Sequence, residues 1–137
     1  PYNFYLFADQ GYPPYGITLV TRDDVIKTKP DVVRRFIHAS VLGWKSYLEN
    51  PAPGNALIKQ ANPKMTDALL AYGVQSIKKF KFVTGGDAAV DGIGTMKDDR
   101  WKASYDYMVS AGLLKASTDW KNAFTTEFVN GLDVKPN

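Results

Sequence analysis

The carboxylates that come nearest to a metal-site spacing lie in a loop rich in glycine and aspartate. Asp87, Asp91 and Asp98 stand at positions one, five and twelve of a calcium-binding loop. Such a loop also needs an oxygen ligand at position three, which is Ala89 here. Its last ligand is a bidentate Glu, whereas this chain has the shorter Asp. We therefore predict no metal site in this loop.

Residues for proton transfer or nucleophilic attack are few. The chain has one histidine, His38, and no cysteine. His38 lies in the middle of a predicted helix, and no nucleophile motif accompanies it. The adjacent carboxylates at 23–24 and 98–99 direct their side chains apart, so neither pair shares a proton, and both stand where a helix start stabilises negative charge. No catalytic residue and no cofactor is predicted.

The composition is that of an ordinary globular protein. Of the 137 residues, 45% are hydrophobic and 23% are charged, which is enough apolar material for the core of one domain. The 17 Lys and Arg and the 14 Asp and Glu are interspersed along the chain. The densest basic run, residues 78–82, alternates lysine with phenylalanine, but a solvated helix end explains it and no nucleic-acid motif accompanies it. We predict no nucleic-acid partner.

The first 22 residues differ from the rest. Residues 2–8 and 17–21 are rich in aromatic or β-branched side chains that roughly alternate, which predicts strands. Residues 9–16 between them contain two prolines and two glycines, which fix a turn or crossover with few backbone donors. This composition suits a hinge or a linker between larger bodies.

From Arg22 onward the pattern predicts helices. One helix starts in the run 28–31, with Thr28 as the N-cap and a proline in its first turn, and it stops before Pro51. The predicted buried face of this helix carries apolar side chains at helical spacing: Val33, Ile37, Val41, Trp44 and Leu48.

Another helix is predicted after the glycine-rich loop. Thr95 and Asp98 form a capping box at its start, and Gly112 supplies the left-handed residue that ends it. A final short helix is predicted from Thr118 onward, with buried aromatic side chains. Stripes of this kind indicate a packed core rather than a cofactor site.

Three segments resemble, in this order, the C-terminal half of NMT1/THI5-like solute-binding proteins: residues 16–51, 92–114 and 119–129. The family pattern combines a proline and an acidic residue at a helix start with a later glycine, acidic residue, tryptophan and Gly-Leu-Leu ending. The matching residues are Pro30, Asp31, Ala39, Gly43, Gly94, Asp98, Trp101, Gly112, Leu113 and Leu114. The chain is therefore similar to receptors of bacterial ABC importers for aliphatic sulfonates, taurine, nitrate and thiamine pyrimidine precursors.

The resemblance implies an α/β fold, namely the C-terminal half of a bilobal type II periplasmic-binding-protein fold whose lobes close over a small molecule. This half is expected to be predominantly helical after residue 22, with one or two N-terminal strands. Residues 1–16 are expected to form the end of the second lobe and a hinge crossing, and residues 17–137 the C-terminal part of the first lobe. The N-terminal half of the same protein is expected to complete the ligand cleft.

The same resemblance implies the substrate-binding component of a bacterial ABC importer. Such a protein binds a small organic solute, similar to a thiamine pyrimidine precursor or a sulfonate, and docks to a permease in the membrane. Because binding needs no chemistry on the solute, the protein is expected not to be an enzyme. Its expected location is periplasmic or otherwise extracytoplasmic, at the membrane through a partner or through a lipid anchor absent from this sequence.

Four residues follow as ligand-binding candidates from the resemblance: Asp9, Tyr12, Tyr15 and Arg22. The two tyrosines are expected to stack on a planar ligand, and Asp9 to accept a hydrogen bond from a ring amine. Arg22 would pair with an anionic ligand through two hydrogen bonds. The alternatives are a packed turn whose tyrosine rings cover the prolines, and a surface salt bridge for Arg22.

Two other functions remain open from the sequence. An enzyme of the pyrimidine-synthesis branch of the same superfamily would need a histidine and a metal- or cysteine-bearing motif in the N-terminal half, and residues 1–137 give it no support. A stand-alone helical interaction domain would leave the apolar run 2–7 as an unpaired edge prone to aggregation.

Overall fold

The computed structural model describes residues 3, 5–12 and 14–136. The chain divides into two compact units, the first formed by Pro1–Thr21 with Met96–Glu127 and the second by Arg22–Thr95 with Phe128–Asn137. Within the described ranges all regular structure is α-helix or 3-10 helix, which confirms the predominantly helical character expected after residue 22. None of the helices in this part of the chain is long and apolar enough to cross a membrane.

The N-terminal strands predicted for residues 2–8 and 17–21 are wrong wherever these residues are described; residues 2 and 4 lie outside that part. Phe7–Gln10 forms a short 3-10 helix, η1. Residues 17–21 have no regular structure, and Val20 is 89% exposed. A strand is held by hydrogen bonds to a neighbouring strand, and the described residues supply none. Alternating side chains alone therefore do not make a strand here.

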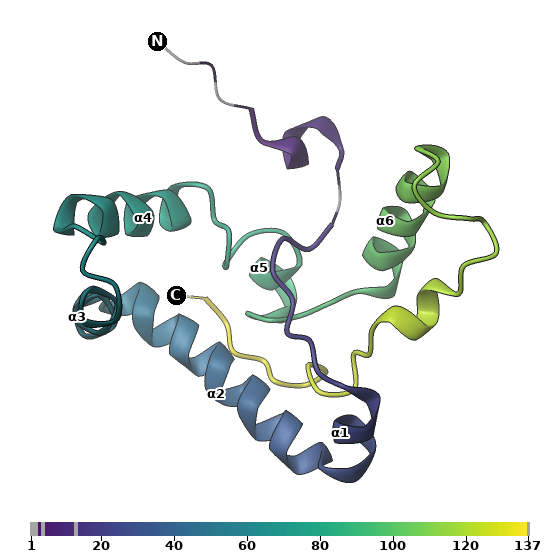
Figure 1. The fold of residues 1–137 in the computed structure, drawn as a ribbon, viewed down its shortest axis with the longest axis horizontal. Coiled ribbons are helices and arrows are strands. Elements are labelled where there is room, and N and C mark those ends of the chain that lie inside the picture. Colours follow the sequence, from purple (N-terminus) through teal and green to yellow (C-terminus); the bar gives the residue numbers. More distant parts are fainter. Residues whose placement is uncertain (1–2, 4, 13, 137) are drawn as a thin grey trace. The chain divides into compact units, whose positions relative to one another are not determined.

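The described residues of the second unit form five α-helices, whose order along the chain can be followed by colour in Figure 1. They are α1 (Asp23–Thr28), α2 (Pro30–Glu49), α3 (Ala52–Ala61), α4 (Asp67–Lys79) and α5 (Asp87–Asp91). α2 packs against both α1 and α3. The hydroxyl of Tyr47 on α2 donates a hydrogen bond of 2.8 Å to Oδ1 of Asn55 on α3, so a side-chain contact helps to fix the angle of this turn.

The N-cap of α2 is Lys29 rather than the predicted Thr28. Thr28 is the last residue of α1, and its hydroxyl donates a hydrogen bond of 2.6 Å to the main-chain oxygen of Asp24. That hydroxyl is therefore engaged in the preceding helix. The other predicted features are confirmed, because α2 begins with a proline and ends at Glu49, before the next proline.

Among the described residues, four apolar side chains form the buried core, and all belong to the second unit: Val41, Leu70, Ile93 and Phe128. The C-terminal segment, residues 128–136, runs beside α2 in Figure 1. The guanidinium carbon of Arg34 lies 5.3 Å from the centre of the Phe128 ring. Farther along, Nζ of Lys45 donates to the main-chain oxygen of Lys135 at 3.2 Å. The C-terminal segment thus completes this core.

Gly94 lies at a close approach between the segment after α5 and α2. Its φ of +87° is left-handed, and a Cβ at this position would stand 2.7 Å from Cγ2 of Val41. The neighbouring N–H of Ile93 donates to the carbonyl oxygen of Val134 at 2.9 Å, which fixes the backbone here. Both the backbone conformation and the available space therefore require glycine.

The first unit contains η1, α6 (Asp98–Ser110) and a second 3-10 helix, η2 (Trp120–Ala123). The predicted end of α6 is confirmed: Gly112 has a φ of +72°, and the N–H groups of residues 112 and 113 donate to the carbonyl oxygens of residues 109 and 108. The predicted capping box is wrong. Lys97 is the N-cap, and Thr95 lies two residues before it, too early in the chain for the capping position.

A stack of aromatic rings holds η2 against α6. The Trp101 and Phe124 rings are nearly parallel, 4.8 Å apart with an interplanar angle of 7°. Trp120 lies 6.0 Å beyond Phe124, and Tyr105 lies 6.2 Å from Trp120. The indole N–H of Trp101 is buried and has no hydrogen-bond partner among the described residues. These contacts make α6 and η2 one packed piece.

Candidate functional site

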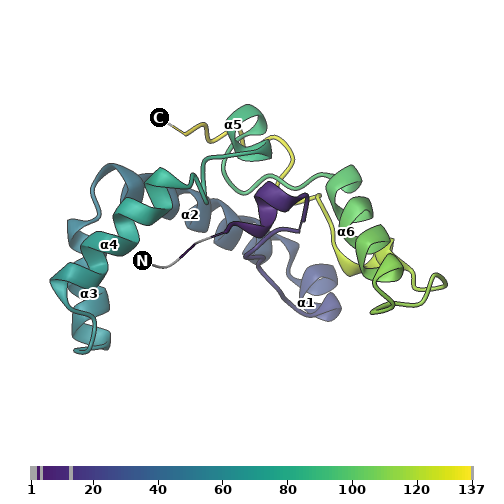
Figure 2. The same ribbon diagram turned by 90° about the horizontal axis from the view of Figure 1, so that it is seen from above.

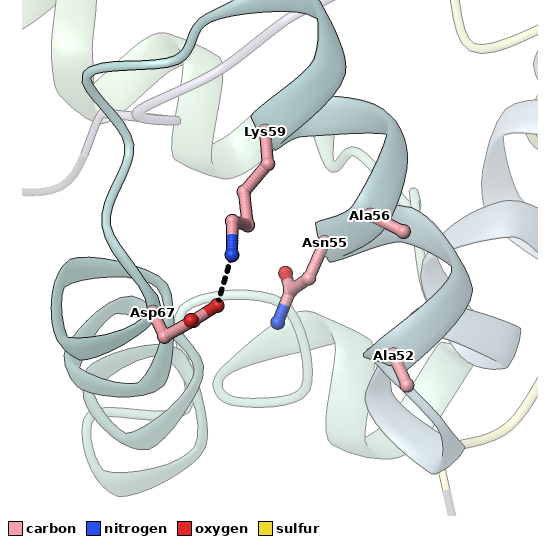
Figure 3. Close-up of a pocket in the computed structure, with 5 residues that line it drawn as sticks. All are labelled: Ala52, Asn55, Ala56, Lys59 and Asp67. Carbon is pink, nitrogen blue, oxygen red and sulfur yellow. Dashed lines mark hydrogen bonds and ion pairs between the residues drawn. The ribbon is translucent and has the colours of Figure 1, made fainter.

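An open hollow of about 500 Å³ lies in the second unit against α3 and α4, which neighbour each other in both views (Figure 2). Figure 3 shows Lys59 and Asp67 pointing toward each other across it, joined by an ion pair of 2.7 Å. Asn55 lies beside them, and its Oδ1 already accepts the hydrogen bond from Tyr47. The two charges neutralise each other, so the hollow has little with which to recognise a charged ligand.

Three of the four predicted ligand residues, Asp9, Tyr12 and Tyr15, lie in the first unit on η1 or just after it. Asp9 is exposed within η1. The chain then folds back, because the N–H of Tyr12 donates to the carbonyl oxygen of Phe7 at 3.1 Å. The rings of Phe7 and Tyr12 consequently lie beside each other, with centroids 6.3 Å apart and planes at 82°.

Tyr12 also contacts α6. Its ring meets the ring of Tyr107 at a centroid distance of 5.0 Å and an interplanar angle of 68°. Edge-to-face pairs of this kind are attractive because the positive edge of one ring faces the negative face of the other. We call Phe7, Tyr12 and Tyr107 the aromatic trio; they are 75%, 36% and 48% exposed.

Tyr15 is half-buried against the start of α6. Its hydroxyl oxygen accepts a hydrogen bond of 2.8 Å from the main-chain N–H of Lys97. The guanidinium carbon of Arg100 lies 4.1 Å from the centre of the Tyr15 ring, and Nη2 of Arg100 donates to the carbonyl oxygen of Pro14 at 3.2 Å. The Trp101 ring is 6.0 Å away. Much of Tyr15 is thus engaged by the protein, and Tyr12 is the more accessible ring.

Arg22, the fourth predicted residue, belongs to the second unit and is the N-cap of α1. Its guanidinium makes two hydrogen bonds to the carboxylate of Asp24, at 2.8 and 2.9 Å. The Arg22 side chain is 82% exposed, so solvent screens this pair and its contribution to stability is small. An anionic ligand would have to replace Asp24 as the partner.

The sequence did not point to two residues that contact the predicted tyrosines, Arg100 and Tyr107. They lie seven positions apart on α6, and two turns of helix bring them to the same face. This spacing is visible in the sequence. Which face of α6 meets Tyr12 and Tyr15 became evident only from the fold.

The three aspartates with calcium-like spacing do not lie together on one loop. Asp87 and Asp91 are the first and last residues of α5, and Asp98 is the first residue of α6. In the part of the chain that the structure describes, no group of three or more His, Cys, Asp or Glu side chains could hold a metal ion.

Known proteins match this chain in two ways. The model of the family described as NMT1/THI5 like matches residues 1–53, the segment that contains all four predicted ligand residues. The chain is also 31% identical, over 114 residues or 82% of its length, to riboflavin-binding protein RibY of Chloroflexus aurantiacus. It spans about a third of that relative, 32% of its length. No solved structure matches the chain significantly.

The match of residues 1–53 to the NMT1/THI5-like family, together with this relative, confirms the resemblance predicted from the sequence. The match to the family model ends at residue 53, in the first turn of α3, so the rest of α3 and all of α4 to α6 lie outside it.

Proposed function

We propose that this chain is part of the substrate-binding component of a bacterial ABC importer, and that its solute is a small planar heterocycle such as riboflavin. The observation that carries the proposal is the 31% identity to a riboflavin-binding protein. The exposed ring of Tyr12 supports it, because aromatic faces stack well on flat ligands. The protein binds its solute without altering it and is not an enzyme.

In this proposal the residues of η1 and the following turn share the recognition of one ligand. Tyr12 stacks on the planar ring, and the exposed carboxylate of Asp9 accepts a hydrogen bond from a ring N–H. Tyr15 contributes the surface that it still exposes and holds the segment against α6 through its bond to Lys97. Few polar groups and a large aromatic surface are typical of sites for flat organic molecules.

The ligand is enclosed between two lobes. Residues 1–16 form the end of the second lobe and a hinge crossing, and residues 17–137 form the C-terminal part of the first lobe. Another part of the same protein supplies the remainder, in keeping with the 32% of the relative that this chain spans. Closure of the lobes around a hinge then creates the shape that a membrane permease recognises outside the cytoplasm.

An anionic solute such as a sulfonate is the second candidate, and Arg22 is the residue that favours it. Its guanidinium already adopts a two-bond geometry toward the carboxylate of Asp24. The same fork fits other anions with two available oxygens. Because the side chains of Arg22 and Asp24 are both exposed, an anionic ligand has room to replace the Asp24 carboxylate as the partner of Arg22.

Thermal melting of the whole protein that contains residues 1–137 tests the proposal. The solutes are riboflavin, a thiamine pyrimidine precursor, taurine and nitrate, each at rising concentration. A ligand that binds only the folded state stabilises it by about 2.7 kcal/mol at 100 times its Kd, so the melting temperature rises with concentration. We expect this rise with riboflavin. No shift with any solute would contradict the proposal, and a shift with taurine or nitrate alone would favour the anionic alternative.

A further inference from the structure

The aromatic trio joins side chains from two separate segments of the first unit. Phe7 and Tyr12 come from η1 and the turn that follows, and Tyr107 comes from the C-terminal part of α6. The planes of Phe7 and Tyr107 are steeply inclined to that of Tyr12, at 82° and 68°. The three rings therefore form walls at steep angles rather than a parallel stack.

Tyr107 takes no part in the stack that joins α6 to η2. Tyr105 belongs to that stack, and two residues along a helix turn the side-chain direction by about 200°. Tyr107 consequently faces away from η2 and is 48% exposed. A single exposed aromatic residue is ordinary, but several exposed rings in mutual contact mark a surface for binding.

We propose that Tyr107 is a specificity-determining residue of the ligand site, and that its ring packs against the planar heterocycle that stacks on Tyr12. This inference rests on the function proposed above. A flat molecule lying on Tyr12 extends toward the neighbouring ring, whose plane is inclined by 68°, and meets it in an edge-to-face contact. Phe7 supplies the corresponding wall on its own side of Tyr12. An alkyl sulfonate or nitrate has no aromatic ring and gains much less binding free energy from contact with the Phe7 and Tyr107 rings.

Riboflavin affinity of single variants of the whole protein, measured by quenching of riboflavin fluorescence, tests the role of Tyr107. Tyr107→Ala removes the ring, and we expect the Kd to rise about tenfold. Tyr107→Phe keeps the ring, so its Kd stays within about twofold of wild type. Tyr72→Ala is the matched control, because Tyr72 is an exposed tyrosine on α4 of the second unit, 68% exposed.

The outcomes separate this inference from the proposed function. A wild-type protein that binds no planar solute contradicts the proposed function. A wild-type protein that binds riboflavin, with Tyr107→Ala as tight as Tyr72→Ala, contradicts only the role of Tyr107 and means that the trio meets another part of the protein. If Tyr107→Ala melts at a much lower temperature than Tyr72→Ala, the riboflavin affinity of Phe7→Ala replaces it as the test. A raised Kd in Phe7→Ala supports the aromatic trio as part of the ligand site, and an unchanged Kd overturns that role.

Discussion

The hydroxyl oxygen of Tyr15 accepts a hydrogen bond of 2.8 Å from the main-chain N–H of Lys97, the N-cap residue of α6. The two residues are 82 positions apart, so the bond ties the N-terminal segment to the start of a distant helix. In a capping box the side chain of the third helical residue would satisfy this N–H. The bond between Tyr15 and Lys97 therefore both caps the helix and keeps Tyr12 close to Tyr107.

Tyr15→Phe should lower the free energy of unfolding by about 1 kcal/mol, because the partly buried N–H of Lys97 loses its acceptor while the ring remains. Urea unfolding of wild type and variant measures the difference. Tyr72→Phe removes an exposed hydroxyl from α4 and serves as the control, with no change expected. Equal stability of the two variants would show that the bond to Lys97 contributes nothing.

Gly94→Ala should destabilise the second unit by about 2 to 4 kcal/mol, because the new Cβ meets Val41 and the left-handed backbone disfavours alanine. Gly43→Ala is the matched change. Gly43 lies within α2, and a Cβ there meets no atom within 4 Å, so alanine should stabilise the helix by about 0.5 to 1 kcal/mol. Denaturant midpoints that move in opposite directions are expected. A Gly94→Ala protein as stable as wild type would exclude the close approach to Val41.

Local signals in the sequence predicted the helices well. The end of α2 before a proline and the left-handed Gly112 after α6 depend on backbone chemistry within one turn, and both are confirmed. The burial of Val41 follows from helical spacing. The strand predicted for residues 17–21 is wrong because a strand needs hydrogen bonds to a neighbouring strand, which local sequence does not reveal. The prediction of Thr28 as a cap is wrong because Thr28 is the last residue of α1, where its hydroxyl bonds to the main-chain oxygen of Asp24.

The candidate site was predictable only in part, for a similar reason. The resemblance to a family directed attention to Asp9, Tyr12 and Tyr15, and their role in binding stays a prediction. Arg100 and Tyr107 became candidates only because the fold brings α6 alongside Tyr12 and Tyr15. Spacing on a helix shows which side chains share a face, but it does not show what that face meets.

Arg22→Ala should change the free energy of unfolding by less than about 0.5 kcal/mol, because the ion pair with Asp24 is exposed and screened. Riboflavin carries no net charge for Arg22 to pair with, so its Kd is expected to stay within about twofold of wild type. Calorimetric titration of riboflavin and of taurine into wild type and variant checks both points. Loss of taurine binding in Arg22→Ala alone would move the assignment to an anionic solute.

Calorimetric titration of riboflavin into the whole protein and into its Tyr12→Ala variant tests most directly whether residues of this chain hold a planar solute. Wild type should give a saturable isotherm with one site, and Tyr12→Ala should bind about tenfold more weakly while Tyr72→Ala binds as wild type does. No binding by wild type, or equal affinity in Tyr12→Ala and Tyr72→Ala, would contradict the account.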